Sequence, residues 1–132
     1  MKNDKQPFLQ AALLCEEVSS DNEGRYTIKN EFSEYTMGYS QPFTVFTIWR
    51  GDKDAGGEVY QQKIEIIAPD GRVIAAGEND PFALKDSTYR QVNSLLLDGV
   101  DFTHDGRYEL KISLSATDGS NASLHTFPIS VI

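Results

Sequence analysis

Segment 107–115, RYELKISLS, alternates strictly between apolar and polar side chains. Tyr108, Leu110, Ile112 and Leu114 share one face, and charged or small polar residues occupy the other. A two-residue period places side chains alternately on the two faces of a β-strand, whereas a helix would spread them around its surface. The segment therefore predicts a half-buried strand, and the rest of the chain must supply the sheet that it joins.

Further segments have the length and composition of strands, and turn residues separate them. They lie at residues 8–18, 25–32, 42–50, 61–68, 72–77, 88–98 and 122–132. Short strands at nearly even spacing, joined by Gly, Asp and Pro, predict an all-β fold, a single-domain antiparallel β-sandwich. The length of 132 residues suits one such domain. We expect residues 7–132 to form it and residues 1–6 to be a flexible N-terminal arm.

Two segments leave their secondary structure open. Residues 8–18, FLQAALLCEEV, have the Ala, Leu and Glu content of a helix. The strands that follow would give this segment a partner, so we favour a strand there. Residues 81–87, PFALKDS, are compatible with a single helical turn.

Other local signals predict turns and sheet position. Residues 69–72, PDGR, stand between two apolar strands and predict a hairpin with a tight turn, because glycine tolerates a positive φ. Pro128 has no N–H for a sheet ladder, which predicts an edge strand or a bulge. Residues 42–50, PFTVFTIWR, are apolar on both faces, which indicates a strand covered on both sides or one at an interface.

The stretch THDGRYELKIS, residues 103–113, combines an acid, a glycine, a cation and a phenol. In immunoglobulin-like sandwiches, a tyrosine near the start of a late strand bonds through its hydroxyl to upstream backbone. Asp105, Gly106 and Tyr108 resemble that corner, with Leu110 where antibody domains carry cysteine. A catalytic site would need a second constellation nearby, and the sequence offers none. We therefore interpret these residues as structural.

The order of the segments resembles that of a known family. FLQAALLCEEV, DNEG, PFTVFTIWRG, IEIIAPDGRVI and finally DGRYELKISL with FPISVI follow one another over residues 7–132. This order is similar to an uncharacterised family of small bacterial β-sandwich domains, labelled as domains of unknown function. The resemblance implies an immunoglobulin-like sandwich. It implies no reaction, because the family offers no catalytic residues to carry over.

Charge and hydropathy argue against two classes of partner. The net charge is −8, and the 12 Lys and Arg residues are scattered singly. Proteins that bind nucleic acid gather cations on one face, so we expect no nucleic-acid partner and, by the same argument, no membrane partner. The apolar run at residues 11–14 is too short to span a bilayer. The N-terminus lacks the apolar core of a signal peptide, so we expect a cytoplasmic protein.

Residue types that serve catalysis do not form recognisable motifs in this chain. Cys15 is the single cysteine, and the charges of Glu16 and Glu17 should raise the pKa of its thiol. His104 and His125 lie far apart without a cysteine framework, which argues against zinc. We expect no enzymatic activity and no cofactor.

A metal ion remains a weaker alternative in one turn. The stretch DGVDFTHDG brings Asp98, Asp101 and Asp105 close together in the sequence. Oxygen-rich loops on β-sandwiches can hold calcium, although aspartate is also common in turns for backbone reasons.

Binding is the function class that the residues favour. Aromatic residues flank the loop at residues 51–58 and serve either as core or as a contact surface: Phe43, Phe46, Trp49 and Tyr60. We predict partner contacts at Trp49, Arg50 and Tyr60. The expected function is a non-catalytic protein-interaction or structural module that binds an unknown protein or associates with itself, and exposed strand edges are a second means of pairing. The alternative is a carbohydrate-binding module that uses the same aromatics, with or without calcium.

Overall fold

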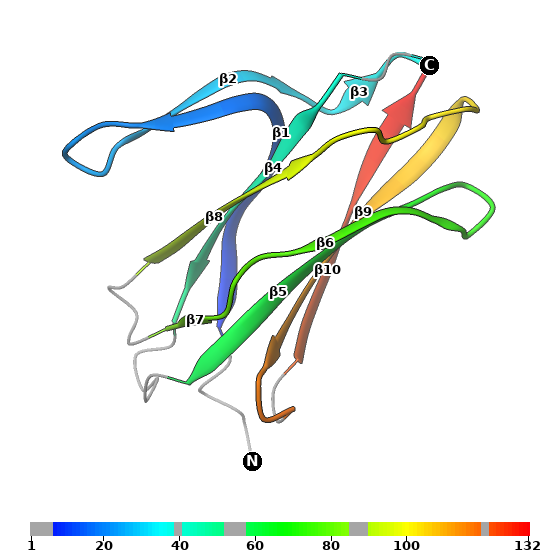
Figure 1. Cartoon of the computed structure of the whole chain (residues 1–132). Coiled ribbons are helices and arrows are strands. Elements are labelled where there is room, and N and C mark those ends of the chain that lie inside the picture. The colour runs from blue at the N-terminus through cyan, green and yellow to red at the C-terminus, as the bar shows by residue number, and fades with distance from the viewer. Residues whose placement is uncertain (1–6, 39–40, 52–57, 85–89, 120–121) are drawn as a thin grey trace.

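The computed structural model of the chain describes residues 7–38, 41–51, 58–84, 90–119 and 122–132. Two facing sheets make up the fold, and no helix occurs among these residues (Figure 1). The strands are β1 (Phe8–Ser20), β2 (Tyr26–Phe32), β3 (Glu34–Tyr35), β4 (Phe43–Arg50), β5 (Val59–Ile67), β6 (Val73–Glu78), β7 (Phe82–Ala83), β8 (Arg90–Leu97), β9 (Gly106–Ala116) and β10 (Ala122–Val131).

The sheets confirm the predicted immunoglobulin-like sandwich, with one difference in strand direction. One sheet has the order β2-β1-β4-β8, and the other has the order β3-β10-β9-β5-β6, with β7 beside β5. The pairs are antiparallel except for β3 and β10, where Ser130 and Val131 lie parallel to Glu34 and Tyr35. Among the described strands, this short pair is the one departure from the predicted antiparallel arrangement. The chain reaches β3 after leaving the other sheet, so the local hairpin rule does not set its direction.

The predicted segments overlap the main strands, and strand also forms in the described part of each segment whose assignment was open. Residues 8–18 belong to β1, which pairs with β2 and β4 on its two edges. This pairing outweighs the helical propensity of Ala, Leu and Glu, since propensity is a weak preference beside tertiary contacts. Phe82 and Ala83 form β7 beside β5 instead of a helical turn. Residues 85–87 and the N-terminal arm, residues 1–6, lie outside the described residues.

One hydrophobic core fills the space between the two sheets. The alternation in residues 107–115 is confirmed, because the apolar side chains of β9 point inward and the polar ones outward. The outer face of this sheet is charged, with Lys111 Nζ 3.8 Å from Glu65 Oε1. The largest apolar side chains that β4, β5, β9 and β10 bury in this core include Phe43, Val45, Trp49, Tyr60, Ile64, Ile66, Tyr108, Leu110, Ile112, Leu114, Ile129 and Val131.

Strand β4 is covered on both faces, as its composition indicated. Its inner face packs in the core, and Phe46 on the outer face is only 4% exposed. Beyond Cys15, β1 no longer pairs with β4 but continues into the β1–β2 hairpin, whose curve is visible in Figure 1. The ring of Tyr26 in this hairpin lies 5.7 Å from the ring of Phe46. Arg90 of β8 donates to the Gly24 carbonyl at 2.9 Å and lies 5.6 Å from the Tyr26 ring centre.

The β1–β2 hairpin carries a backbone irregularity where it leaves the sandwich. Asn30 has a φ of 53°, in the left-handed region that non-glycine residues rarely adopt. Its side-chain Nδ2 donates to Glu16 Oε2 on the facing strand at 2.8 Å. This residue lies between the part of β2 that reaches the core, at Phe32, and the part that extends to Tyr26.

The β5–β6 hairpin forms at the predicted place, but its loop is longer than a two-residue tight turn. Ile67 pairs with Val73, which leaves residues 68–72 as the connection. The N–H of Gly71 donates to the Ala68 carbonyl at 2.9 Å, and Gly71 has a φ of 91°. The left-handed glycine that the sequence indicated is therefore present, in a loop with a bulge instead of a primed turn.

Candidate binding groove

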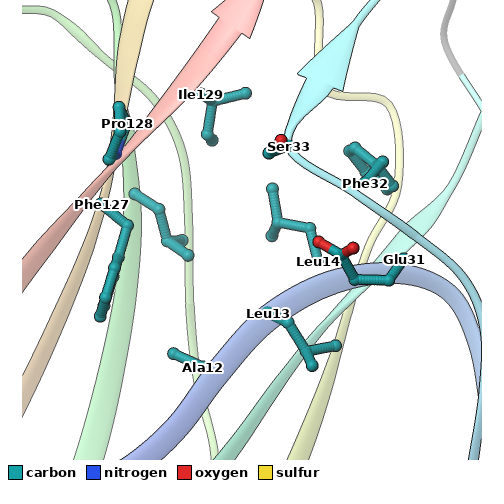
Figure 2. A pocket seen from close by; sticks show the side chains of 10 residues that line it. Ala12, Leu13, Leu14, Glu31, Phe32, Ser33, Phe127, Pro128 and Ile129 are labelled. Carbon is teal, nitrogen blue, oxygen red and sulfur yellow. The ribbon is translucent and has the colours of Figure 1, made fainter.

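An apolar groove opens between the two sheets on the side where β1 faces β10 (Figure 2). Its volume is about 250 Å³. Strand β1 contributes residues 12–14 and β10 contributes residues 127–129, while Leu110 of β9 and Phe32 of β2 complete the apolar lining. Figure 2 shows the Glu31 carboxylate among these side chains. Glu31 is exposed to solvent, so the apolar groove has a negative charge at its rim.

The two sides of the sandwich differ in how closely the sheets approach. At Gly77 of β6, a Cβ atom would lie 2.9 Å from Leu95 Cδ2 of β8, so glycine permits close approach on that side. On the opposite side, the inward positions of β1 include the small Ala12 beside Leu14. A small side chain at the border leaves space that a larger one would fill. The groove therefore lies on the open side of the sandwich.

Both strands that border the groove have an unpaired outer edge. Strand β1 pairs with β2 only from Leu14 onward, and β10 pairs with β3 only at residues 130–131. Within the described part of the chain, residues 8–13 and 122–129 thus have a strand neighbour on one edge alone. The prediction from Pro128 is confirmed, since this part of β10 is an edge.

Glu31 is the acidic residue that lines the groove, and it belongs to a part of the chain that is rich in acids. Residues 8–35, which include β1, β2 and β3, contain six Asp and Glu residues but only two Lys and Arg residues. A second hollow of about 160 Å³ shares Phe32 with the groove, and Glu16 and Glu34 line it. This region therefore combines an apolar interior with a negative border.

The structure places Trp49 and Tyr60 in the core, which corrects their interpretation as surface contacts. Trp49 is 0% exposed and Tyr60 is 1% exposed. Arg50 is half-buried, and its Nε donates to Gln10 Oε1 at 2.6 Å. These three residues do not border the groove. The sequence placed them near a loop, but β4 and β5 are central strands whose inward faces are covered by the opposite sheet.

A buried polar network accounts for Trp49 and was not anticipated from the sequence. Gln62 Oε1 accepts from Trp49 Nε1 at 2.6 Å and from Thr47 Oγ1 at 2.7 Å. Gln62 Nε2 donates to Asn79 Oδ1 at 2.7 Å. Thr47 and Gln62 stand at inward positions of otherwise apolar strands, which is the signal that identifies such a network. Nearby on β8, the buried Nδ2 of Asn93 has no hydrogen-bond partner among the described residues.

The corner residues have the geometry of a structural device. The Tyr108 hydroxyl donates to the His104 carbonyl at 2.8 Å, and the Tyr108 ring is 2% exposed. Gly106 has a φ of 132°, and a Cβ there would lie 3.2 Å from Pro69 Cγ. The backbone angle thus favours glycine strongly, and the close approach of the β5–β6 loop adds to this preference. Asp105 is exposed and lines a hollow beside that loop.

The described residues do not gather into a metal site. Among them, no group of three or more His, Cys, Asp and Glu side chains has the arrangement to hold a metal ion. The structure therefore does not bring Asp98, Asp101 and Asp105 together as calcium ligands. The described residues also include no helix with the length and apolar composition that crossing a membrane would require.

Cys15 is buried, and its surroundings keep the thiol protonated. Burial raises its pKa, and the negative charge of Glu31 acts in the same direction. The backbone N–H of Glu17 lowers the pKa and partly opposes these effects. The direction agrees with the expectation from sequence, but the carboxylate responsible lies on β2 instead of beside Cys15 in the chain.

Solved structures that resemble the chain are distant in sequence. The C-terminal domain of wzt has a TM-score of 0.65 and 13% identity, over 97% of this chain and 74% of that chain. At this identity the likeness shows the fold alone. The CARDB domain of a Pyrococcus furiosus protein, solved in complex with di-metal ions, has a TM-score of 0.47 and 12% identity over 99% and 97% of the two chains. An immunoglobulin-like protein from Pseudomonas aeruginosa has a TM-score of 0.42 and 12% identity over 99% and 100%.

No curated protein matches the chain. A family model does match, over residues 10–130, and it is described as a family of unknown function, DUF6941.

Proposed function

We propose that this chain, which belongs to the family of unknown function DUF6941, is a non-catalytic module that binds another protein. The observation that carries the proposal is the apolar groove bordered by two open strand edges. Open edges offer backbone hydrogen bonds to an extended segment, and a groove beside them accepts its side chains. This combination suits a polypeptide ligand better than a small polar molecule.

The carbohydrate alternative receives no support from the aromatic residues on which it rested. Sugar platforms need exposed rings, but the four candidate rings are buried: Phe43, Phe46, Trp49 and Tyr60. Self-association at the groove is opposed by charge, because two copies that each carry −8 repel one another. A different protein is therefore the preferred partner.

Affinity capture followed by direct binding tests the proposal. The tagged domain is exposed to native lysate, enriched proteins are quantified by mass spectrometry, and each candidate is purified and titrated against the domain by calorimetry. A matched variant, Ala12→Phe, fills the groove from β1. We expect a partner that binds the wild-type domain directly and binds Ala12→Phe at least tenfold more weakly. The proposal is contradicted when no enriched protein binds the purified domain.

A further inference from the structure

We infer that the open edge of β10 receives an extended, positively charged segment of the partner as an added strand. This inference rests on the proposed function and specifies its site and the chemistry of its ligand. Three features carry it: the direction of the β10 backbone groups, the groove beside them, and the acidic border.

The backbone of β10 shows which groups face the open edge. The N–H of Ser130 donates to the Ser33 carbonyl at 3.1 Å, and the N–H of Ile132 donates to the Tyr35 carbonyl at 3.0 Å. Backbone groups of successive residues point to opposite edges of a strand, and the β9–β10 register is continuous. The N–H groups of Leu124 and Thr126 therefore point toward the same edge, where no described strand pairs with them.

Pro128 limits the length of the added strand. By the same alternation, its nitrogen faces the open edge, where it can donate no hydrogen bond. Strand β3 occupies the edge beyond it, at residues 130–131. An incoming strand is thus confined to residues 122–127 of β10. A segment of about six residues fits this length.

The groove determines which side chains the segment carries. Alternate side chains of an added strand point toward the space between the sheets. There they meet Phe127 of β10 and the apolar residues 12–14 of β1. An apolar side chain of the ligand that lies beside Phe127 would therefore be buried.

Charge favours a basic segment. Glu31 lies at the rim of the groove that Phe127 also lines, and the chain as a whole carries a net charge of −8. Lys or Arg in the segment would complement this negative charge, whereas an acidic segment would be repelled. A second copy of this chain, with a net charge of −8, fits the site less well.

Two peptides test the inference directly. The probe is acetyl-Lys-Val-Thr-Val-Lys-Val-amide, and its matched control replaces both Lys residues by Glu. Binding is followed at low salt through the backbone amide signals of the ¹⁵N-labelled domain. We expect the Lys peptide to shift the signals of Leu124 and Thr126 and to bind at least tenfold more tightly than the Glu peptide. Equal binding of both peptides, absence of binding, or shifts confined to β6 and β8 would overturn the inference.

Two matched pairs of variants separate backbone pairing from charge. Thr126→Pro removes the N–H that faces the open edge, and Thr126→Val retains it. We expect at least tenfold weaker binding of the Lys peptide for Thr126→Pro and less than a twofold change for Thr126→Val. Glu31→Gln should weaken binding about threefold or more, whereas Glu109→Gln, on the outer face of the same sheet as β10, should leave it unchanged. If Thr126→Pro prevents folding, the comparison of Glu31→Gln with Glu109→Gln still tests the inference.

The outcomes distinguish this inference from the proposed function. A purified partner that binds Thr126→Pro and Glu31→Gln as tightly as wild type would leave the proposed function standing and overturn the inference. A dimer of the domain, seen by light scattering and abolished in Thr126→Pro, would also overturn it in favour of a second copy. The absence of any direct partner overturns the proposed function itself.

Discussion

Tyr108 combines a ring in the core with a hydroxyl that donates to the His104 carbonyl at 2.8 Å. We expect Tyr108→Phe to lower the free energy of unfolding by about 1–2 kcal/mol, because a nearly buried hydrogen bond is lost while the ring stays in place. Urea unfolding measures this change. The control is Tyr26→Phe, whose ring is 39% exposed and which should change stability by less than about 0.5 kcal/mol. Equal losses in the two variants would argue against the corner.

Gln62 is the residue on which the buried polar network depends. Its side chain accepts from Trp49 and Thr47 and donates to Asn79. Gln62→Leu leaves these groups without their partner in the core, so we expect stability to fall by about 2–4 kcal/mol. The adjacent Gln61 points outward on the same strand and donates at 3.2 Å to Glu78 and to the Asn79 carbonyl, so Gln61→Leu should lower stability by only about 0.5–1 kcal/mol. Chemical denaturation of both variants tests this, and a neutral Gln62→Leu would show that the network does not stabilise the fold.

The Cys15 thiol makes stability depend on pH in the alkaline range. Burial raises its pKa in the folded state above the ordinary value of 9.0. Above about pH 9 the unfolded chain loses this proton while the folded chain retains it, so stability falls as pH rises. The stabilising effect of the neutral thiol is fully present below that pH. We expect the difference in unfolding free energy between wild type and Cys15→Ala to be constant from pH 7 to 8.5 and to shrink above pH 9. A difference that stays constant to pH 10.5 would contradict this.

At the scale of elements, the β1–β2 hairpin depends on a strained backbone position. Asn30 has a φ of 53°, which an alanine adopts at a cost of about 1 kcal/mol and a glycine adopts freely. Both substitutions remove the Asn30 hydrogen bond to Glu16, so their comparison isolates the backbone. We expect Asn30→Ala to be about 1 kcal/mol less stable than Asn30→Gly in urea unfolding. Equal stability would mean that the hairpin relaxes to another conformation at this residue.

The same hairpin explains why β4 was open to two interpretations. A pattern of apolar residues on both faces shows that both faces need cover, but it does not say what supplies the cover. Here Tyr26 lies against Phe46, a contact between residues twenty positions apart that no local pattern records. At this position the cover comes from the chain itself. The second interpretation, an interface with another molecule, is not needed to explain Phe46.

At the scale of the whole molecule, strand positions could be predicted from the sequence more completely than the site could. The alternation in residues 107–115 and the turn at Gly71 are local properties, and the structure reproduces both. The position of β10 at an edge followed from Pro128, since a missing N–H is also local. The groove depends on which strands lie side by side. That requires the pairing of β1 with β4 and of β10 with β9, which strand periodicity does not specify.

The burial of two candidate contacts, Trp49 and Tyr60, was missed for the same reason. Trp49 and Tyr60 are bulky, lie near a loop, and would suit a surface, but they belong to central strands and are buried. The residues that do border the groove, such as Ala12 and Phe127, have no distinguishing feature in the sequence. Only the arrangement of the sheets brings these two residues to one side of the sandwich.

Pro128 also bears on how the protein behaves when it is concentrated. An uninterrupted open edge is a template on which identical chains can stack into fibrils, and a proline within it limits the stacking. We expect Pro128→Thr, which restores the missing donor without changing the inward face of β10, to form thioflavin-positive fibrils sooner than wild type in shaken, concentrated solution. Thr126→Ser, which leaves the proline in place, is the control and should match wild type. The residue that shortens the open edge of β10 would thereby also keep the protein in solution, because the length of that edge limits how identical chains can stack.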